Sequence, residues 1–299
     1  MSTFDKYLKG KRYSTSSIEG YVVTIQRFES WLYKKVIPLK QVNYGDIIDY
    51  IKSLQQRQIK QRTIQQYISV INNYFNFLIY TKQYKKQNPL SKIKVQGVGR
   101  SAILDILSEE ELKCIHESYS ASGIRYERNL CMLGLIIYQG LGTRDLIRLS
   151  IKDIDLFNQF IFISSSKRSN ERKLTLSEDQ VDNLNQYLNQ GRERIVKRKN
   201  LESETLFLSN GRGFKLKNSI QNMLNEIRLI SPRVHSVNHL RASVISNWTK
   251  KYNLREVQYM AGHKYVSSTE HYQQQNLDNV HDDIIKFHTI VQNKEYILR

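Results

Sequence analysis

Apolar residues recur at helical spacing through most of this 299-residue chain, and that pattern restricts it to a mainly helical fold. One such stripe runs from Ile18 to Leu32 after the potential N-caps Ser14–Ser16, and a second runs from Ile64 to Leu78. Ser-x-x-Glu and Ser-x-x-Gln capping patterns predict helix starts at Ser108 and Ser177. Further helices are expected at 46–54, 129–139, 218–229, 237–250, 254–260, 268–272 and about 280–291.

A single short region departs from the helical period. Phe160–Ile163 is β-branched and aromatic, residues 173–176 alternate polar and apolar, and the polar run SSSKRSNER lies between them. We predict a β-hairpin here. The fold class expected is therefore mainly α with a small β-hairpin or sheet, in two domains.

Positive charge is concentrated in the first third of the chain. Residues 1–100 carry 18 Lys and Arg against 5 Asp and Glu, a net of +13 out of +18 for the whole chain. We predict a helical, nucleic-acid-binding domain at 1–95, a linker at 96–107 that contains Gly97 and Gly99, and a second domain at 108–299. The partner expected is double-stranded DNA, although a generally lysine-rich surface would give the same charge. The candidate phosphate contacts are Lys34, Lys35, Lys60, Arg62, Lys85 and Lys86.

The cysteine count and the apolar runs favour a cytoplasmic protein. The two cysteines have no CxxC or Cys/His neighbours, so no metal site is expected. The first ten residues lack an apolar core typical of a secretory signal. The apolar run at 132–138 is too short to cross a membrane, and no membrane partner is expected.

Three segments could supply phosphate chemistry together. Arg241 begins an apolar-periodic helix, His263 follows Gly262 at a helix end, and Tyr272 lies nine residues later. Lys167 lies at the tip of the predicted hairpin, where it could protonate a leaving oxygen. Cationic neighbours are expected to lower the pKa of the Tyr272 phenol. Taken singly, each residue has an ordinary explanation as a surface or turn side chain.

In combination these segments resemble the tyrosine recombinase, or phage integrase, family over nearly the whole chain. YQGLGTRDLIRLSIKDIDL, at 138–156, looks like the first arginine box, and GHKYVSSTEHY has the Gly-His…Tyr spacing. The resemblance implies a helical core-binding domain followed by a catalytic domain. It also implies that Tyr272 is the nucleophile, Arg241 the second arginine, Lys167 the hairpin lysine and His263 the histidine of the Gly-His box.

Two positions depart from the family pattern. Gly142 stands where the family has its first arginine, and Asn238 stands where it has the histidine of His-x-x-Arg. Three interpretations are open: Arg144 substitutes, His239 acts from a shifted register, or the site works with a weakened clamp. One missing charge donor costs about 10²–10³ in rate.

The resemblance implies DNA cleavage and rejoining through a 3′-phosphotyrosyl bond. It implies no cofactor and a homotetramer on two DNA duplexes, serving a mobile genetic element. The tail at 273–299 would pack on a neighbouring subunit or, equally well, on its own domain. The alternative is a catalytically weakened DNA-binding protein of the same fold.

Overall fold

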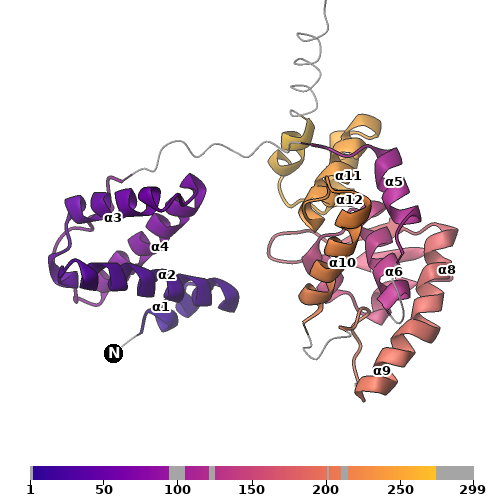
Figure 1. Ribbon diagram of the computed structural model, residues 1–299, viewed down its shortest axis with the longest axis horizontal. Helices are drawn as coiled ribbons and strands as arrows, with labels where there is room; N and C mark the ends of the chain where they lie inside the picture. The colour runs from indigo at the N-terminus through magenta and orange to yellow at the C-terminus, as the bar shows by residue number, and fades with distance from the viewer. Residues whose placement is uncertain (1–2, 94–104, 121–124, 201, 210–214, 274–299) are drawn as a thin grey trace, which may run out of the picture. The chain divides into compact units, whose positions relative to one another are not determined.

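A computed structural model of the chain describes residues 3–93, 105–120, 125–200, 202–209 and 215–273. The chain divides into two compact units, Met1–Ser101 and Ala102–Arg299 (Figure 1). Most of the expected linker at 96–107, and all of the tail beyond residue 273 with its expected last helix, lie outside the described residues.

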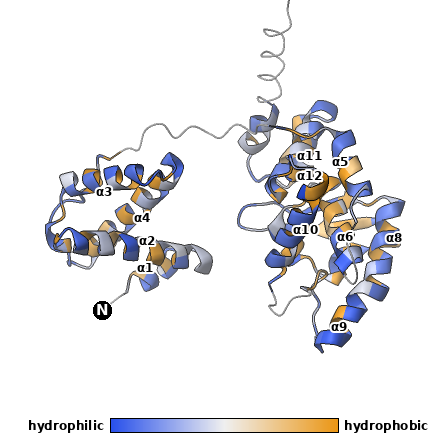
Figure 2. Ribbon diagram, in the orientation of Figure 1, coloured by the Kyte–Doolittle hydropathy of each residue, from blue (hydrophilic) through white to orange (hydrophobic). Residues whose placement is uncertain are grey.

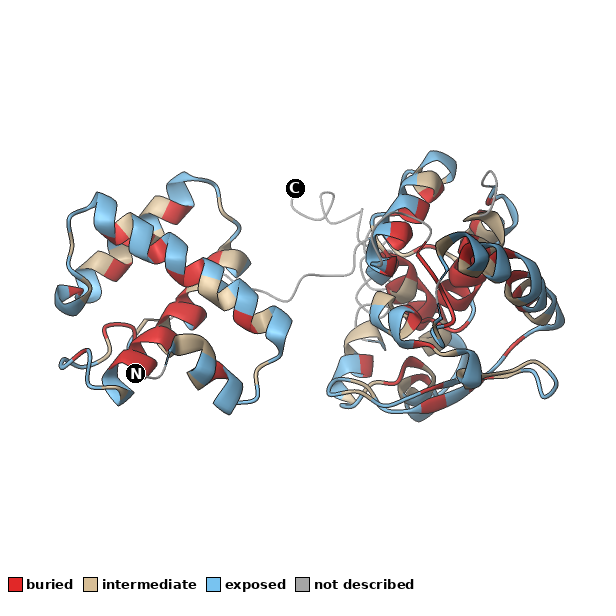
Figure 3. Cartoon of the chain, turned by 90° about the horizontal axis from the view of Figure 1, so that it is seen from below, coloured by how far each residue is buried: buried red, intermediate tan, exposed pale blue. Residues whose placement is uncertain are grey.

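Four helices build the described part of the first unit, residues 3–93, and α4 contacts each of the others. Ser14 caps α2 by accepting the amide of Ser17, and a reciprocal capping box of Asn43 and Asp46 opens α3. The apolar stripes meet around Phe28 and Phe75. Figure 3 shows buried stretches of these helices, in red, between exposed ones. The helices are α1 (Phe4–Gly10), α2 (Thr15–Lys34), α3 (Tyr44–Gln56) and α4 (Gln61–Tyr80), with a 3-10 turn at Leu39–Gln41.

The second unit is a helical bundle around α6, which is buried along most of its length and contacts α5, α8 and α11. Hydrophobic residues line the facing sides of these helices (Figure 2). The helices are α5 (Glu109–Glu117), α6 (Tyr126–Ile137), α7 (Thr143–Arg148), α8 (Glu178–Gln186), α9 (Glu193–Lys199), α10 (Leu216–Ile230), α11 (Val237–Lys251) and α12 (Leu254–Ala261). A 3-10 turn, Ile151–Asp153, precedes the sheet, and a π-helical stretch, Tyr187–Arg192, joins α8 to α9.

A small antiparallel sheet of order β1-β2-β3 stands beside the bundle. It consists of β1 (Ile154–Asp155), β2 (Phe160–Ile163) and β3 (Arg172–Thr175). The predicted hairpin is confirmed, and the short β1 was not expected. β3 begins one residue earlier than the alternation indicated, so Arg172 pairs with Ile163 instead of lying in the turn.

The predicted fold class is confirmed. α1 and α7 were not among the expected helices, and the other differences lie mainly at helix ends. The capping boxes at Ser108 and Ser177 form as expected. The helix expected at 129–139 is α6, which ends at Ile137, before Gly140 takes a left-handed φ of 59°. No sequence pattern indicates the π-helical stretch, because its residues continue a helical pattern that only hydrogen bonding can separate into types.

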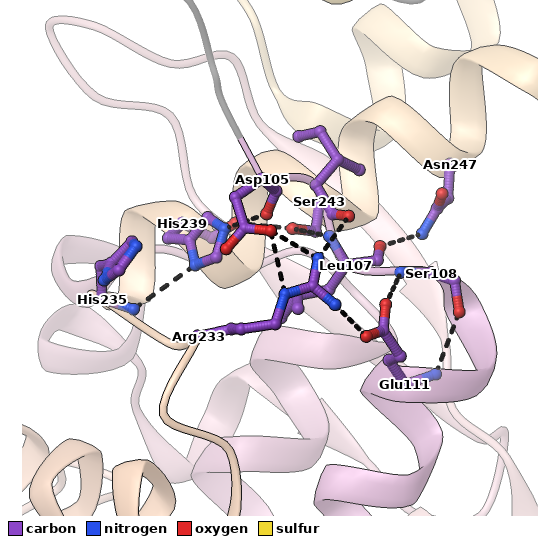
Figure 4. A network of polar contacts seen from close by, with 10 residues as sticks. Asp105, Leu107, Ser108, Glu111, Arg233, His235, His239, Ser243 and Asn247 are labelled. Atoms are coloured by element: carbon purple, nitrogen blue, oxygen red, sulfur yellow. Dashed lines mark hydrogen bonds and ion pairs between the residues drawn. The ribbon is translucent and has the colours of Figure 1, made fainter. Parts of the chain in front are cut away.

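The start of the second unit is tied to α11 by buried hydrogen bonds. The Leu107 amide donates to Ser243 Oγ at 3.1 Å, and Asn247 Nδ2 donates to the Leu107 carbonyl at 3.0 Å (Figure 4). Arg233 adds ion pairs to Asp105 and Glu111. These bonds fix residues 105–108 on the bundle.

No described helix is long and apolar enough to cross a membrane. All but the last residue of the central apolar run at 132–138 lies within α6, which packs against α5, α8 and α11. Within the described ranges, His, Cys, Asp and Glu side chains form no group of three or more suited to holding a metal ion.

The cap on α5 leads to a stability prediction. Ser108 Oγ accepts the amide of Glu111 at 3.2 Å, and the Ser108 amide donates to Glu111 Oε2 at 2.8 Å. We expect Ser108→Ala to lower the free energy of unfolding of the second unit by about 1 kcal/mol, because an orphan helix amide loses its acceptor. Urea unfolding followed by Trp248 fluorescence, in a Trp31→Phe background, measures this unit. Ser108→Thr keeps the hydroxyl and should restore most of the loss; equal losses in both variants would contradict the capping role.

Candidate active site

Tyr272 is positioned by the turn that follows α12. The helix ends at Gly262 in a left-handed conformation, φ 66°, and residues 267–273 are helical again. His263 Nδ1 lies 2.9 Å from Thr269 Oγ1, which ties the start of the turn to the second helical segment. The His263 ring stacks on the Tyr272 ring, with centroids 5.8 Å apart and planes 14° from parallel. The Gly-His…Tyr spacing therefore brings imidazole and phenol face to face.

Arg241 reaches the same place from the beginning of α11. Its guanidinium donates to the carbonyls of Gly140 and Ala261, which lie at or just beyond the C-terminal ends of α6 and α12. Helix C-termini carry partial negative charge, so they stabilise a cation held there. Asp145 Oδ2 lies 3.7 Å from Arg241 Nη1, and the Arg241 side chain keeps 17% of its surface exposed. Arg241 is thus fixed in place but still accessible.

The pKa of Tyr272 shifts in the direction opposite to the one expected. Burial raises the pKa of the phenol above its ordinary 10, and the positive charge of Arg241 only partly opposes this. The expectation of a lowered pKa was therefore wrong, because it counted the cations but not the loss of water. A phenol with a pKa above 10 keeps its proton at neutral pH.

Lys167 lies on the exposed loop between β2 and β3. This loop is attached to the turn that precedes Tyr272: the Asn170 amide donates to the Gly262 carbonyl at 3.0 Å, and Ser169 forms a β-bridge with His263. At the other side of the loop, Arg148 Nη2 donates to the Ser165 carbonyl at 2.8 Å. The hairpin that carries Lys167 is therefore held against the Gly-His turn.

Arg172 is a site residue that the sequence patterns missed. Its side chain is fully buried, and Nη2 lies 3.0 Å from Asp145 Oδ2. On β3 it faces inward together with Leu174, while Lys173 and Thr175 face out. Extending the period-two alternation back by one residue would have found it, but the polar run KRSNERK disguised it as part of a turn.

Of the two departures from the family pattern, Gly142 is partly buried and Asn238 lies at the surface. Arg144, in α7, is exposed, and so is Asn238 at the start of α11. Gly142 precedes α7, and its amide donates to Asp145 Oδ2 at 3.1 Å. The structure therefore does not bring Arg144 into the group formed by Arg241, His263 and Tyr272.

His239 lies on a different side of α11. Its Nε2 is 2.6 Å from the Asp105 carbonyl, and Nδ1 faces the His235 amide at 3.4 Å (Figure 4). With both ring nitrogens engaged there, His239 helps to anchor residues 105–108. The structure does not place it with Arg241 and Tyr272.

The first unit presents a basic surface of its own. A groove of ≈510 Å³ is lined by Arg27, Lys34 and Arg57 together with the aromatic rings of Trp31, Tyr50 and Tyr67. Arg57 lies on a basic polar helix face that the sequence indicated, whereas Arg27 was not among the sequence candidates. The six basic residues singled out from the sequence are all exposed: Lys34, Lys35, Lys60, Arg62, Lys85 and Lys86.

Comparison with known sequences identifies the family. The profile of the phage integrase family matches residues 105–278, and that of the phage integrase N-terminal SAM-like domain matches residues 1–82. The chain belongs to the phage integrase family. The expected resemblance is thereby confirmed, and with it a site-specific DNA recombinase enzyme of the tyrosine recombinase type.

Relatives and structural neighbours of this phage integrase family member span nearly the whole chain. Tyrosine recombinase XerC of Oceanobacillus iheyensis is 24% identical, covering 96% of this chain and 95% of its own. XerH site-specific recombinase, in a post-cleavage complex with palindromic difH substrate, gives a TM-score of 0.72 at 18% identity over 95% of this chain and 85% of its own. A lambda integrase tetramer bound to a Holliday junction gives 0.67 at 14% identity, over 90% and 74% of the two chains. At these identities the structures establish the fold alone.

The partial burial of His263 next to two arginines predicts a pKa well below that of an exposed histidine. Burial, reinforced by the charges of Arg241 and Arg172, lowers the pKa of His263 from 6.5 to about 4. Unfolded His263 takes up its proton near pH 6.5, so between these values the unfolded state binds more protons. The free energy of unfolding therefore falls as pH drops from about 6.5 to about 4, and His263→Asn should lack this contribution. NMR titration of the DNA-free protein measures the imidazole directly; a midpoint near 6.5 would contradict the enclosed site.

Proposed function

We propose that this recombinase cuts and rejoins double-stranded DNA through a 3′-phosphotyrosyl intermediate, with Tyr272 as nucleophile. One observation carries the proposal. The Tyr272 ring stacks on the His263 ring, and the fixed Arg241 guanidinium is near enough for its charge to act on the Tyr272 phenol. A phenol beside a guanidinium suits attack on a phosphate, because the guanidinium stabilises the negative charge that develops on the phosphate while the phenol gives up its proton during the attack.

The reaction balances with the residues of this chain. Tyr272 Oη forms a bond to phosphorus and releases its proton to solvent, while the bond from phosphorus to the 5′ oxygen breaks. Lys167, on the docked hairpin loop, donates a proton to that leaving oxygen and is reprotonated from solvent. Arg241 stabilises the charge on the pentacoordinate phosphate, and neutral His263 contributes a hydrogen bond. Attack of a 5′ hydroxyl on the phosphotyrosine reverses the step and conserves the bond energy.

Neither residue considered as a replacement takes part in this scheme. Arg144 is exposed on α7, and His239 is engaged by the Asp105 carbonyl. We therefore leave both outside the catalytic set, which consists of Tyr272, Arg241, Lys167 and His263.

The proposed partner is double-stranded DNA, bound in part through the basic surface of the first unit. We further propose a homotetramer acting on two duplexes in the cytoplasm, in the service of a mobile element. The lambda integrase tetramer on a Holliday junction supports this assembly by its similar fold.

Covalent trapping tests the nucleophile. Because the target sequence is unknown, the probe is a library of nicked duplexes of randomised sequence, in which a short 5′-hydroxyl fragment is lost after cleavage. Wild-type protein should form a denaturation-resistant DNA adduct, and Tyr272→Phe should form none, since phenylalanine has no oxygen to attack phosphorus. Tyr265→Phe removes an exposed hydroxyl from the same turn and should leave the adduct unchanged.

The result also decides the alternative, a DNA-binding protein whose chemistry is weakened at Gly142 and Asn238. That protein would bind the library tightly without an adduct. An adduct that survives Tyr272→Phe would instead move the nucleophile elsewhere.

Salt dependence tests the basic surface of the first unit. Lys34→Gln with Lys35→Gln should weaken binding to a random-sequence duplex and flatten the slope of log K against log salt by about 0.9 for each phosphate that is no longer neutralised. Lys113→Gln with Lys197→Gln removes the same charge from exposed ion pairs of the second unit. Fluorescence anisotropy over a salt series should show the smaller slope only for the first pair; equal changes would mean that net charge alone governs binding.

A further inference from the structure

A side chain at position 142, where this chain has glycine, would point toward Arg241 and Asp145. A Cβ built on Gly142 lies 3.8 Å from Arg241 Cδ and 3.8 Å from Asp145 Oδ2. An arginine there would therefore extend beside the Asp145 carboxylate and the second arginine. Any substitute for the family's first arginine has to bring a guanidinium to this spot.

Arg172 brings one. Its Nη2 lies 3.0 Å from Asp145 Oδ2, the oxygen that also accepts the Gly142 amide and lies 3.7 Å from Arg241 Nη1. Asp145 Oδ2 therefore lies close to three groups: the Gly142 amide, Arg241 and Arg172. The guanidinium comes from β3 instead of from the start of α7, but it ends beside the same acceptor.

The hydrogen bonding of Arg172 is incomplete. Its side chain has no exposed surface, and neither Nε nor Nη1 has a partner among the described residues. A buried cation with unused donors is costly, since each such donor has lost water and gained nothing. An acceptor that arrives with the substrate would remove this cost, and an anionic phosphate oxygen is the strongest such acceptor.

The turn after α12 leaves room for the Arg172 guanidinium because it has a glycine at position 262. A Cβ at Gly262 would collide with Arg172 Nη1, and the left-handed φ of 66° also favours glycine there. Gly262 directly precedes His263, whose pKa is lowered in part by the charge of Arg172. Arg172 is therefore packed against the segment that leads to Tyr272.

We propose that Arg172 replaces the first arginine that this chain lacks at position 142, as a catalytic residue whose unused donors bind the non-bridging oxygens of the attacked phosphate. The inference rests on the proposed function, in which Tyr272 attacks that phosphate. The sequence suggested two other substitutes, but Arg144 is exposed and His239 is hydrogen-bonded to the Asp105 carbonyl.

The test measures the rate of adduct formation on a nicked duplex that wild-type protein selects from the randomised library. We expect Arg172→Met, which keeps the apolar stem, to slow the rate about 10²–10³-fold. Adding Gly142→Arg to that variant restores the guanidinium from the family's usual position and should recover at least a tenth of the wild-type rate. Arg194→Ala, at a half-exposed ion pair with Glu127, is the matched loss of one arginine and should stay near wild type.

A second readout separates charge stabilisation from a structural role. A methylphosphonate at the cleaved position replaces a charged oxygen by a methyl group, so there is less charge to neutralise. The ratio of wild-type to Arg172→Met rates should shrink on this substrate at least tenfold. Arg172→Lys keeps the charge and serves if the methionine variant does not fold; its smaller defect should shrink in the same way.

The outcomes distinguish the two proposals. If wild-type protein forms no adduct, or Tyr272→Phe forms one equally well, the proposed function fails. If the adduct depends on Tyr272 but the Arg172 variants react at the wild-type rate, the assignment of Arg172 fails alone. A defect that is equal on both substrates and is not relieved by Gly142→Arg makes Arg172 a structural partner of Asp145 and overturns the inference.

Discussion

The carboxylate of Asp145 is the contact on which the site depends. It accepts the Gly142 amide, pairs with Arg172 at 3.0 Å and lies 3.7 Å from Arg241. These three groups come from the start of α7, from β3 and from α11, so one negative charge holds together three elements distant in sequence. Without it, two guanidinium groups would face each other across a water-poor space and repel.

Carbonyl groups at helix ends complete the balance of charge. Arg241 is held by the carbonyls of Gly140 and Ala261, at the ends of α6 and α12. Such carbonyls carry partial negative charge that cannot be titrated away, so the cation stays fixed without being neutralised. The site therefore keeps a surplus of positive charge, which adds to the effect of burial in lowering the pKa of His263 and leaves a binding place for an anion. The same surplus does not overcome the burial of Tyr272, whose phenol stays protonated.

Much of this arrangement could be predicted from local patterns. The capping boxes at Ser108 and Ser177 and the hairpin strand Phe160–Ile163 form where short-range chemistry indicated. The Gly-His…Tyr spacing likewise led to residues that the fold does bring into contact. Local signals were sufficient there because each depends on residues a few positions apart. The pKa of Tyr272 could not be predicted in this way, since it depends on how much water the rest of the unit excludes.

The sequence by itself determined the helical fold class and the basic first third, because periodicity and charge are properties of neighbouring residues. Its resemblance to the phage integrase family supplied Tyr272 as the nucleophile candidate. Only the tertiary structure decided which arginines share a site. Arg144 and Arg172 lie in similarly polar segments, yet one ends exposed and the other fully buried. The difference follows from the inward face of β3 and from the space left by Gly262, and both are set by contacts between elements far apart in the chain.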